Sequence, residues 1–241
     1  ILMKKQGLYD PLFEHENCGA GFICSLKGVK TNKIIHSALN ILTCLEHRGA
    51  VSSDGRTGDG AGILIEIPHQ FFSKECDFDL PNPGEYAVGM LFLPQKTNQA
   101  DYCIKTFEDE VINQKLKIIG WRDVPVNSKV VGSIASKSQP IIKQVFITKE
   151  NDNQNEKEFN LKLYLARKVA ENKIYSSPLS QKNFFYFSSL HNKTIIYKGL
   201  LIPEDIEINV NYEDDDILVI DKNSGLIVHA SSSSYICTSL R

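Results

Sequence analysis

Residues 60–94, GAGILIEIPHQFFSKECDFDLPNPGEYAVGMLFLP, contain the two apolar runs on which the fold prediction starts. The runs are GAGILIEIP (60–68) and EYAVGMLFLP (85–94), and each is typical of a β-strand. The polar segment between them contains Pro81 and Pro83 and is expected to be a loop. These residues therefore predict two strands with a loop between them.

A helix is expected before the first run, over residues 31–50. Its apolar positions recur at helical spacing and share one face: Ile34, Ala38, Ile41, Leu42 and Leu45. Thr31 or Asn32 is suited to cap its N-terminus, and Gly49 to end it.

The remaining elements extend this pattern in both directions. Strands are expected over 21–28, 116–126, 139–149, 184–190 and 194–201, and helices over 98–115 and 159–175. Helices and strands come in pairs more than in strict alternation. This order favours a layered α/β (α+β) domain with largely antiparallel sheets.

Composition narrows the class of protein. The chain has 241 residues, of which 42% are hydrophobic and 23% charged, as in ordinary globular domains. A net charge of −2 gives no electrostatic reason to expect nucleic acid as a partner. No apolar run approaches the roughly 20 residues that span a bilayer, and the first residues do not form a secretory signal. We therefore expect no membrane partner.

The six cysteines form no CxxC pair and no zinc pattern with the histidines, so no metal site is predicted. In a long chain without a signal peptide, most cysteines are reduced thiols packed as small hydrophobic residues. A cytoplasmic location is the expectation.

Cys18, in FEHENCGAGF (13–22), is a possible exception. It can be a buried thiol, half of a disulfide, a metal ligand or a nucleophile, and a nucleophile needs a base to form its thiolate. Cleavage between Asn17 and Cys18 would create an α-amino group, with a pKa of about 8, on the nucleophile's own residue. That amine can take the thiol proton and later give it to a leaving amine.

A second motif, LEHRGAVSSDGRTGDGAG (45–62), joins the expected helix to the strand at 60–68. Arg48 in its His-Arg-Gly part can hold a carboxylate beside a strand, or it can simply cap the helix. The glycines that follow predict a flexible loop. This loop lacks the Gly-Lys-Ser/Thr ending of a phosphate-binding loop and is too short for a dinucleotide fingerprint.

Three segments together closely resemble a known family. LYDPLFEHENCGAGFICSLKG (8–28), residues 41–72 and GEYAVGMLFLP (84–94) resemble the class II glutamine amidotransferase domain of the glutamate synthase large subunit. That domain is an N-terminal nucleophile hydrolase, and the resemblance covers about residues 7–203. It implies an αββα sandwich, here in truncated form.

The resemblance also implies roles for individual residues. Residues 1–17 would be a propeptide, and residues 18–203 a partial amidotransferase domain. Cys18 would attack the side-chain amide of glutamine, form a glutamyl thioester and release ammonia. Arg48 and Gly49 of the His-Arg-Gly motif, together with Phe22, would shape the site.

The cofactors and partners that the resemblance implies belong to the whole glutamate synthase. That enzyme makes two glutamates from glutamine and 2-oxoglutarate with FMN, an iron–sulfur cluster, an electron donor and a small subunit. We expect no cofactor in this chain. Its partners would be glutamine and the remainder of the enzyme.

Residues 204–241 depart from the resemblance. The family's His-Gln-Arg-Phe-Ser-Thr-Asn segment and its oxyanion-binding Asn-Gly pair are not found in residues 202–241. Because one oxyanion donor is commonly worth about 10²–10³ in rate, we expect a chain that is nearly inactive. The alternative is a non-catalytic remnant or interaction protein.

This tail is instead similar to the start of the catalytic domain of pseudouridine synthases that modify large-subunit ribosomal RNA. It is predicted to be an unrelated, incomplete domain or an ordinary acidic β-hairpin, with strands at ILVID (217–221) and LIVH (226–229). A fragment of an RNA-modifying fusion is thus a further alternative, although the net charge of −2 argues against RNA.

Overall fold

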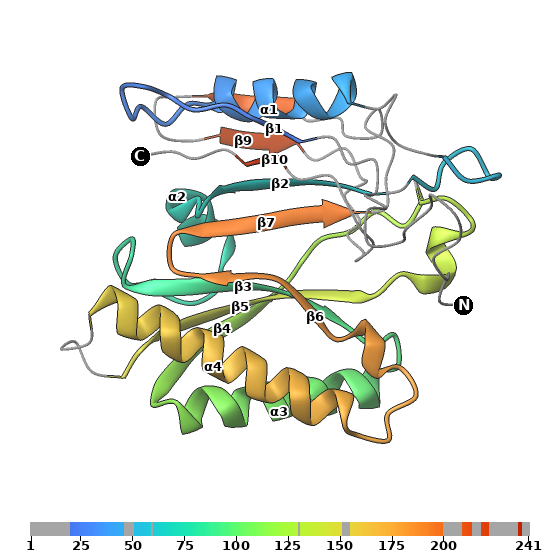
Figure 1. Ribbon diagram of the computed structural model, residues 1–241. Helices are drawn as coiled ribbons and strands as arrows, with labels where there is room; N and C mark the ends of the chain where they lie inside the picture. The colour runs from blue at the N-terminus through green and yellow to red at the C-terminus, as the bar shows by residue number, and fades with distance from the viewer. Residues whose placement is uncertain are drawn as a thin grey trace, which may run out of the picture.

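The computed structural model describes residues 20–45, 51–58, 60–129, 131–150 and 155–199, and three strands at 209–213, 218–221 and 236–237. Its elements form four layers, seen edge-on in Figure 1. Helix α1 (Asn32–Cys44) covers one sheet, a second sheet lies below the first, and helices α3 (Thr97–Asn113) and α4 (Glu156–Tyr175) cover the second sheet.

The first sheet has the strand order β1-β10-β2-β7. β2 (Ala61–Glu66) pairs with β7 (Thr194–Gly199) in antiparallel orientation. On its other side β2 pairs in parallel with β10 (Ile236–Cys237), which in turn pairs in parallel with β1 (Gly21–Phe22). A strand from the end of the chain therefore lies between the first two strands of the domain.

The second sheet is antiparallel throughout and has the order β4-β5-β3-β6. Its strands are β3 (Tyr86–Leu93), β4 (Leu116–Asp123), β5 (Ile141–Lys149) and β6 (Tyr186–His191). β6 and β7 follow each other closely in the chain but belong to different sheets. Their connection fixes one sheet against the other.

All residues of β3 are buried, and this explains why its sequence is a continuous apolar run. One face of β3 points toward the other sheet and carries Tyr86, Val88, Met90 and Phe92. Their cluster also includes Phe72, Phe146 of β5 and Ile195 of β7. The alternate residues Ala87, Leu91 and Leu93 belong to the cluster beneath α3 and α4. Because successive side chains of a strand point to opposite faces, a strand buried on both faces requires a layer on each side.

Helices α3 and α4 pack on the second sheet through one apolar face each. α3 contributes Cys103, Phe107 and Val111, which are fully buried. α4 contributes Phe159, Leu163, Ala166, Ala170 and Ile174 to the same cluster. The side chain of Asn155 caps α4 by accepting a hydrogen bond from the Glu158 backbone N–H at 2.9 Å.

The predicted α/β class with an αββα arrangement and largely antiparallel sheets is confirmed. The helix predicted over 31–50 is present as α1, and Ile34, Ala38 and Leu42 are buried as expected. The helix ends at Cys44 with Leu45 as its C-cap, so the prediction that Gly49 ends it is wrong. Thr31 occupies the N-cap position but makes no capping hydrogen bond with its side chain.

The loop expected between the strands at 60–68 and 85–94 contains a short helix, α2 (His69–Glu75), that was not predicted. Its Phe72 is fully buried and contacts the ring of Phe146 edge-on, at a centroid distance of 5.1 Å. Tertiary packing of this one aromatic side chain therefore places the helix.

The tail contains an antiparallel pair of strands, β8 (Asn209–Glu213) and β9 (Leu218–Asp221). β9 coincides with a strand expected from the sequence ILVID, whereas β8 was not predicted. The second strand expected there, 226–229, lies outside the described residues.

Candidate functional site

Of the predicted site residues, the structure describes only Phe22. Its side chain is 76% exposed and lies on β1. Cys18, Arg48 and Gly49 lie outside the described residues, so their predicted proximity stays a prediction.

Two other cysteines are unsuited to act as nucleophiles, because both are shielded from water. Burial raises the pKa of the Cys103 thiol to about 12. Burial also raises the pKa of Cys76 to about 11, although the nearby Arg122 guanidinium opposes the shift. At neutral pH both are thiols and not thiolates, and the thiolate is the reactive form. Neither residue competes with Cys18 for a nucleophilic role.

The glycine-rich segment before β2 is a defined hairpin in its described part, 51–58. Val51 and Gly58 form an antiparallel bridge, and the Ser52 backbone N–H donates to the Thr57 carbonyl at 2.8 Å. The turn closes with a hydrogen bond from Gly55 N–H to the Ser52 carbonyl at 2.9 Å. Gly55 has a φ of +70°, a conformation that favours glycine. We call residues 51–58 the Gly-rich hairpin.

The carboxylate of Asp54 connects this hairpin to a distant loop, residues 131–138. Its Oδ1 accepts hydrogen bonds from the backbone N–H of Arg56 at 3.1 Å and of Thr57 at 2.8 Å. Its Oδ2 accepts from the Thr57 hydroxyl at 2.7 Å and from the Ile134 backbone N–H at 2.9 Å. One side chain thus satisfies donors on two loops that lie 80 residues apart in the chain.

Thr57 completes the contact between the two loops. It is 6% exposed, and its hydroxyl oxygen accepts a hydrogen bond from the Ala135 backbone N–H at 3.2 Å. Gly132 faces this pair so closely that an added Cβ would meet the Thr57 hydroxyl and would lie 2.6 Å from Asp54 Oδ2. The approach of the loops therefore requires glycine at position 132.

The electrostatics of Asp54 follow from these donors. The hydrogen bond from Ile134, followed by those from Thr57, holds the pKa of the Asp54 carboxyl well below its usual range. Asp54 is therefore ionised across the physiological pH range and acts only as an acceptor.

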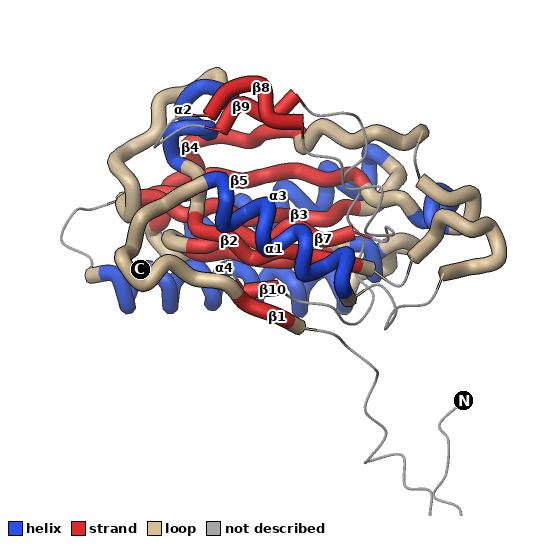
Figure 2. The backbone as a smooth tube through the Cα atoms, turned by 90° about the horizontal axis from the view of Figure 1, so that it is seen from above, coloured by secondary structure: helices blue, strands red, loops and turns tan. Residues whose placement is uncertain are grey.

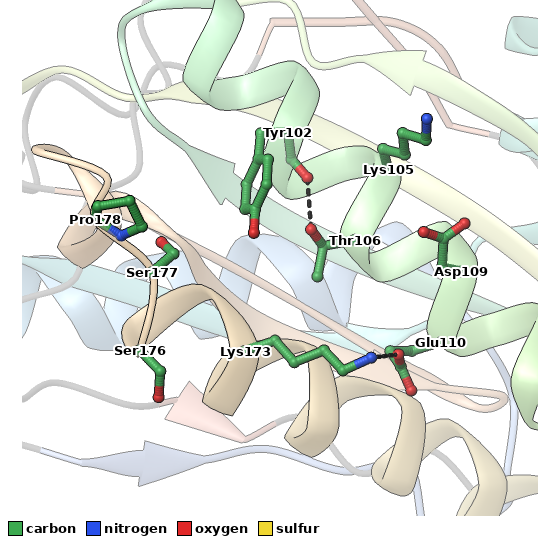
Figure 3. Close-up of a pocket in the computed structure, with 9 residues that line it drawn as sticks. All are labelled: Tyr102, Lys105, Thr106, Asp109, Glu110, Lys173, Ser176, Ser177 and Pro178. Atoms are coloured by element: carbon green, nitrogen blue, oxygen red, sulfur yellow. Dashed lines mark hydrogen bonds and ion pairs between the residues drawn. The ribbon is translucent and has the colours of Figure 1, made fainter.

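A separate hollow lies between α3 and α4, on the outer helix layer (Figure 3). Two pairs of its polar groups bond to each other: Lys173 Nζ donates to Glu110 at 2.5 Å, and the Thr106 hydroxyl donates to the Tyr102 carbonyl at 2.8 Å. The hollow lies on the far side of the second sheet from α1 and β2 (Figure 1). It contains no nucleophile paired with a base and offers no competing active site.

Among the described residues, no group of three or more His, Cys, Asp or Glu side chains is arranged to hold a metal ion. Within the same residues, no helix is long and apolar enough to cross a membrane.

Sequence reasoning missed Asp54, Thr57 and Gly132. The Asp54-Gly55 pair was an available turn signal, but the segment was interpreted only as a flexible loop. Nothing local in the sequence indicates that residues 131–135 supply the donors.

Comparison with known proteins places the sequence of this chain in a family. The family model for glutamine amidotransferases of class II matches residues 18–230. Its first matched residue is Cys18. The match continues past residue 203, where the sequence predicted a boundary, and that predicted boundary remains untested.

Curated relatives carry glutamate synthase names. The chain is 41% identical to the "Glutamate synthase [NADPH] large chain" of Bacillus subtilis over 232 residues, which are 96% of this chain and 15% of that protein. It is 40% identical to "Glutamate synthase [NADH]" of Saccharomyces cerevisiae over 246 residues, which cover 97% of this chain and 11% of that protein. It is 37% identical to "Ferredoxin-dependent glutamate synthase 2, chloroplastic" of Arabidopsis thaliana over 203 residues, with 82% and 12% covered. The chain thus spans only 11–15% of the length of these three relatives.

Proposed function

The chain belongs to the class II glutamine amidotransferases, and from this premise we propose that it binds glutamine and that Cys18 attacks the side-chain amide. The observation that carries the proposal is the start of the family match at Cys18. It supports a domain whose first working residue is that cysteine. The burial of Cys76 and Cys103 agrees with this choice of nucleophile.

The proposed chemistry uses the new N-terminus. Removal of residues 1–17 frees the α-amine of Cys18, which accepts the thiol proton as sulfur attacks the amide carbon. The carbon–nitrogen bond then breaks, the proton passes to the leaving nitrogen, and ammonia departs. A glutamyl thioester remains on Cys18, and water releases glutamate from it.

Arg48 and Gly49 are proposed to hold the substrate beside Cys18, with Phe22 at the edge of the site. A guanidinium pairs well with the α-carboxylate of glutamine because its planar donors match two carboxylate oxygens. The exposure of Phe22 agrees with a position at an open edge.

The wider reaction is a proposal drawn from the relatives' names. Ammonia from Cys18 would serve glutamate synthesis from 2-oxoglutarate, with the remainder of a glutamate synthase and its small subunit as partners. FMN and an iron–sulfur cluster would be held by other regions of such an enzyme. A cytoplasmic location is part of the proposal, since Cys24, Cys76 and Cys103 are free thiols, as in reducing compartments.

Two alternatives from the sequence remain predictions. One is a non-catalytic remnant; the other is an RNA-modifying fragment in residues 204–241. The second receives no support from the family match, which continues to residue 230. The proposed domains, 1–17, 18–203 and 204–241, are likewise untested.

The test is affinity labelling with a diazoketone analogue of glutamine, followed by peptide mass spectrometry. We expect one adduct at Cys18, prevented by excess glutamine and absent from Cys18→Ala. The exposed Cys24 is the internal control, because it should react with iodoacetamide but not with the analogue. Labelling of Cys24 at the same rate as Cys18, without protection by glutamine, would contradict the proposal.

A further inference from the structure

We propose that the outer face of α4 is an interface with a second copy of this chain, related by a two-fold axis that crosses the helix near residue 163. In Figure 1, α4 lies beside α3 in the outermost layer at the bottom of the molecule. The interface uses no residue of the proposed glutamine site. It is formed by apolar side chains that the fold of one copy leaves in contact with water.

Helix α4 carries apolar side chains on two opposite faces. On the outer face lie Leu161, Tyr164 and Leu165, which are 56%, 56% and 39% exposed. Their spacing of three and four residues places them side by side on the surface of the helix. We call these three residues the α4 stripe. The opposite face packs on the second sheet through five fully buried residues, Phe159, Leu163, Ala166, Ala170 and Ile174.

The neighbouring helix α3 has no such stripe among its described residues. It exposes two large apolar side chains, Tyr102 and Ile112, but these lie ten positions apart in the sequence. Lys105 and Asp109 lie between them and line the hollow of Figure 3. Single exposed apolar residues are ordinary on protein surfaces, whereas contiguous apolar patches mark interaction sites. The α4 stripe is of the second kind, and we infer that a partner covers it.

Charged residues of opposite sign flank the stripe. Glu158 lies three residues before Leu161, and Lys168 lies three residues after Leu165. Each already has an ion pair within α4: Glu158 with Lys162 at 3.3 Å, and Lys168 with Glu171 at 2.7 Å. The two side chains are nevertheless 46% and 45% exposed. Because a carboxylate accepts several hydrogen bonds and an ammonium donates three, each can pair with a further group across an interface.

This order of side chains is complementary to itself in antiparallel orientation. Leu161 and Leu165 are centred on position 163, and so are Glu158 and Lys168. A two-fold axis at that level places Leu161 of one copy against Leu165 of the other. The same axis places Glu158 against the other copy's Lys168. In a two-fold interface one patch serves both copies and every contact occurs twice, so the charges favour a second copy as the occupant.

The small size of the stripe predicts a weak dimer. Two helices that pack through one such stripe bury less area than a standard interface of about 1,600 Å². We therefore expect a Kd of about 10–100 μM, which is typical of transient association. Tyr164 should be the main anchor, since tyrosine is enriched among the residues that dominate binding at interfaces.

The experiment is sedimentation equilibrium of the 241-residue chain from about 1 μM to about 1 mM, which measures the Kd of dimerisation. The variants are Leu165→Glu in the stripe and Glu158→Lys and Lys168→Glu beside it. The matched control is Leu26→Glu, because Leu26 is 99% exposed and connects β1 to α1, in the opposite helix layer. Circular dichroism and thermal unfolding show whether each variant is folded.

For Leu165→Glu we expect the Kd to rise at least about 10-fold, because a carboxylate enters the apolar contact at two positions. Glu158→Lys alone and Lys168→Glu alone should each raise it about 3- to 30-fold, since like charges then face each other twice. An equal mixture of these two variants should recover the wild-type Kd, because both contacts then join an acid to a base. Leu26→Glu should match wild type.

Four results would overturn the proposal. A wild-type chain that stays monomeric up to about 1 mM would assign the stripe to another occupant, such as the remainder of a longer enzyme. A dimer that survives Leu165→Glu, or that is lost in Leu26→Glu, would place the interface elsewhere. A mixture of the two charge variants that fails to recover association would exclude the antiparallel arrangement.

The test stands even if Lys168→Glu does not fold, which its contact with the buried Glu171 makes a risk for that variant alone. Leu165→Glu and Glu158→Lys then decide, since an unchanged Kd in both would contradict the proposal. Labelling of Cys18 by the glutamine analogue is measured separately, so failure of the dimer and failure of the proposed function are distinguishable.

Discussion

The two sheets differ sharply in how they are held. The sheet β4-β5-β3-β6 lies under α3 and α4 on a dense cluster that includes Phe107, Leu163 and Phe187, all fully buried. In the described part of the other helix layer, Ala38 and Leu42 of α1 pack against Ile63 of β2, with partly buried neighbours. Figure 2, viewed from above, shows α1 lying across this sheet.

The difference separates a layer held by apolar packing from a layer held in part by directed hydrogen bonds. The second sheet has apolar packing on both faces and needs little else. The first sheet carries the strand that follows Cys18 and the Gly-rich hairpin, and that hairpin is positioned by hydrogen bonds of Asp54 and Thr57. Apolar burial therefore fixes the second sheet, and directed hydrogen bonds fix the Gly-rich hairpin.

Thiol reactivity should show the largest contrast between the layers. Cys103 lies in the apolar cluster beneath α3 and α4, and its pKa is raised to about 12, whereas Cys24 is exposed. Because Cys103 is fully buried and its thiol stays protonated at pH 8, its alkylation should be at least about 10³-fold slower than that of Cys24. Peptide mapping after iodoacetamide treatment measures both rates. Equal rates in the native protein would contradict the packing described, and equal rates in denaturant are the control.

Phe107→Ala should have the largest effect on stability. The Phe107 ring lies 4.8 Å from the ring of Phe187 and 6.4 Å from that of Trp121, measured between centroids. Its removal leaves a cavity in the apolar cluster beneath α3 and α4 and should lower the free energy of unfolding by about 3–5 kcal/mol. Urea denaturation measures the change. A loss below about 1 kcal/mol would mean that the cluster is loosely packed.

Leu42→Ala in α1 should cost less, about 2–3 kcal/mol, near the lower end for a buried leucine. Leu42 is 3% exposed, but its partly buried neighbours give the surroundings room to relax. The same urea experiment tests this, with Leu39→Ala as a control at a half-buried position of the same helix. A loss equal to that of Phe107→Ala would erase the contrast between the layers.

The smallest effect is expected from the ion pairs on α4 that join Glu171, whose side chain is buried, to the more exposed Arg167 and Lys168. Burial alone would raise the pKa of Glu171, but hydrogen bonds from Lys168 and Arg167 outweigh it and leave the pKa lowered. A lowered pKa in the folded state stabilises above the unfolded value of about 4.3, and this contribution is lost as the pH falls below it. Glu171→Gln should therefore cost less than about 1 kcal/mol at pH 7 and little at pH 3. Equal losses at both pH values, in thermal unfolding, would contradict this assignment.

The sequence predicted the scaffold better than the site. The apolar run 85–94 and the helical spacing at 31–45 carry their own signal, and both elements are present. A strand was expected over 21–28, but β1 covers only Gly21–Phe22, since its partner is β10 near the other end of the chain. Likewise, the position of α2 depends on the packing of Phe72 against Phe146. The hydrogen bonds of Asp54 include one from the Ile134 N–H, 80 residues later in the chain. Periodicity does not report such long-range contacts.

The most direct test of the account is to trap the proposed intermediate. The protein is mixed with saturating glutamine, quenched in acid and analysed by peptide mass spectrometry. We predict a peptide that begins at Cys18 and carries a glutamyl group as a thioester, with at least as much ammonia released as thioester formed. Its formation should be slow, because the oxyanion-binding Asn-Gly pair is not found in residues 202–241. A peptide that runs unbroken from Asn17 into Cys18, without an adduct at any glutamine concentration, would contradict it.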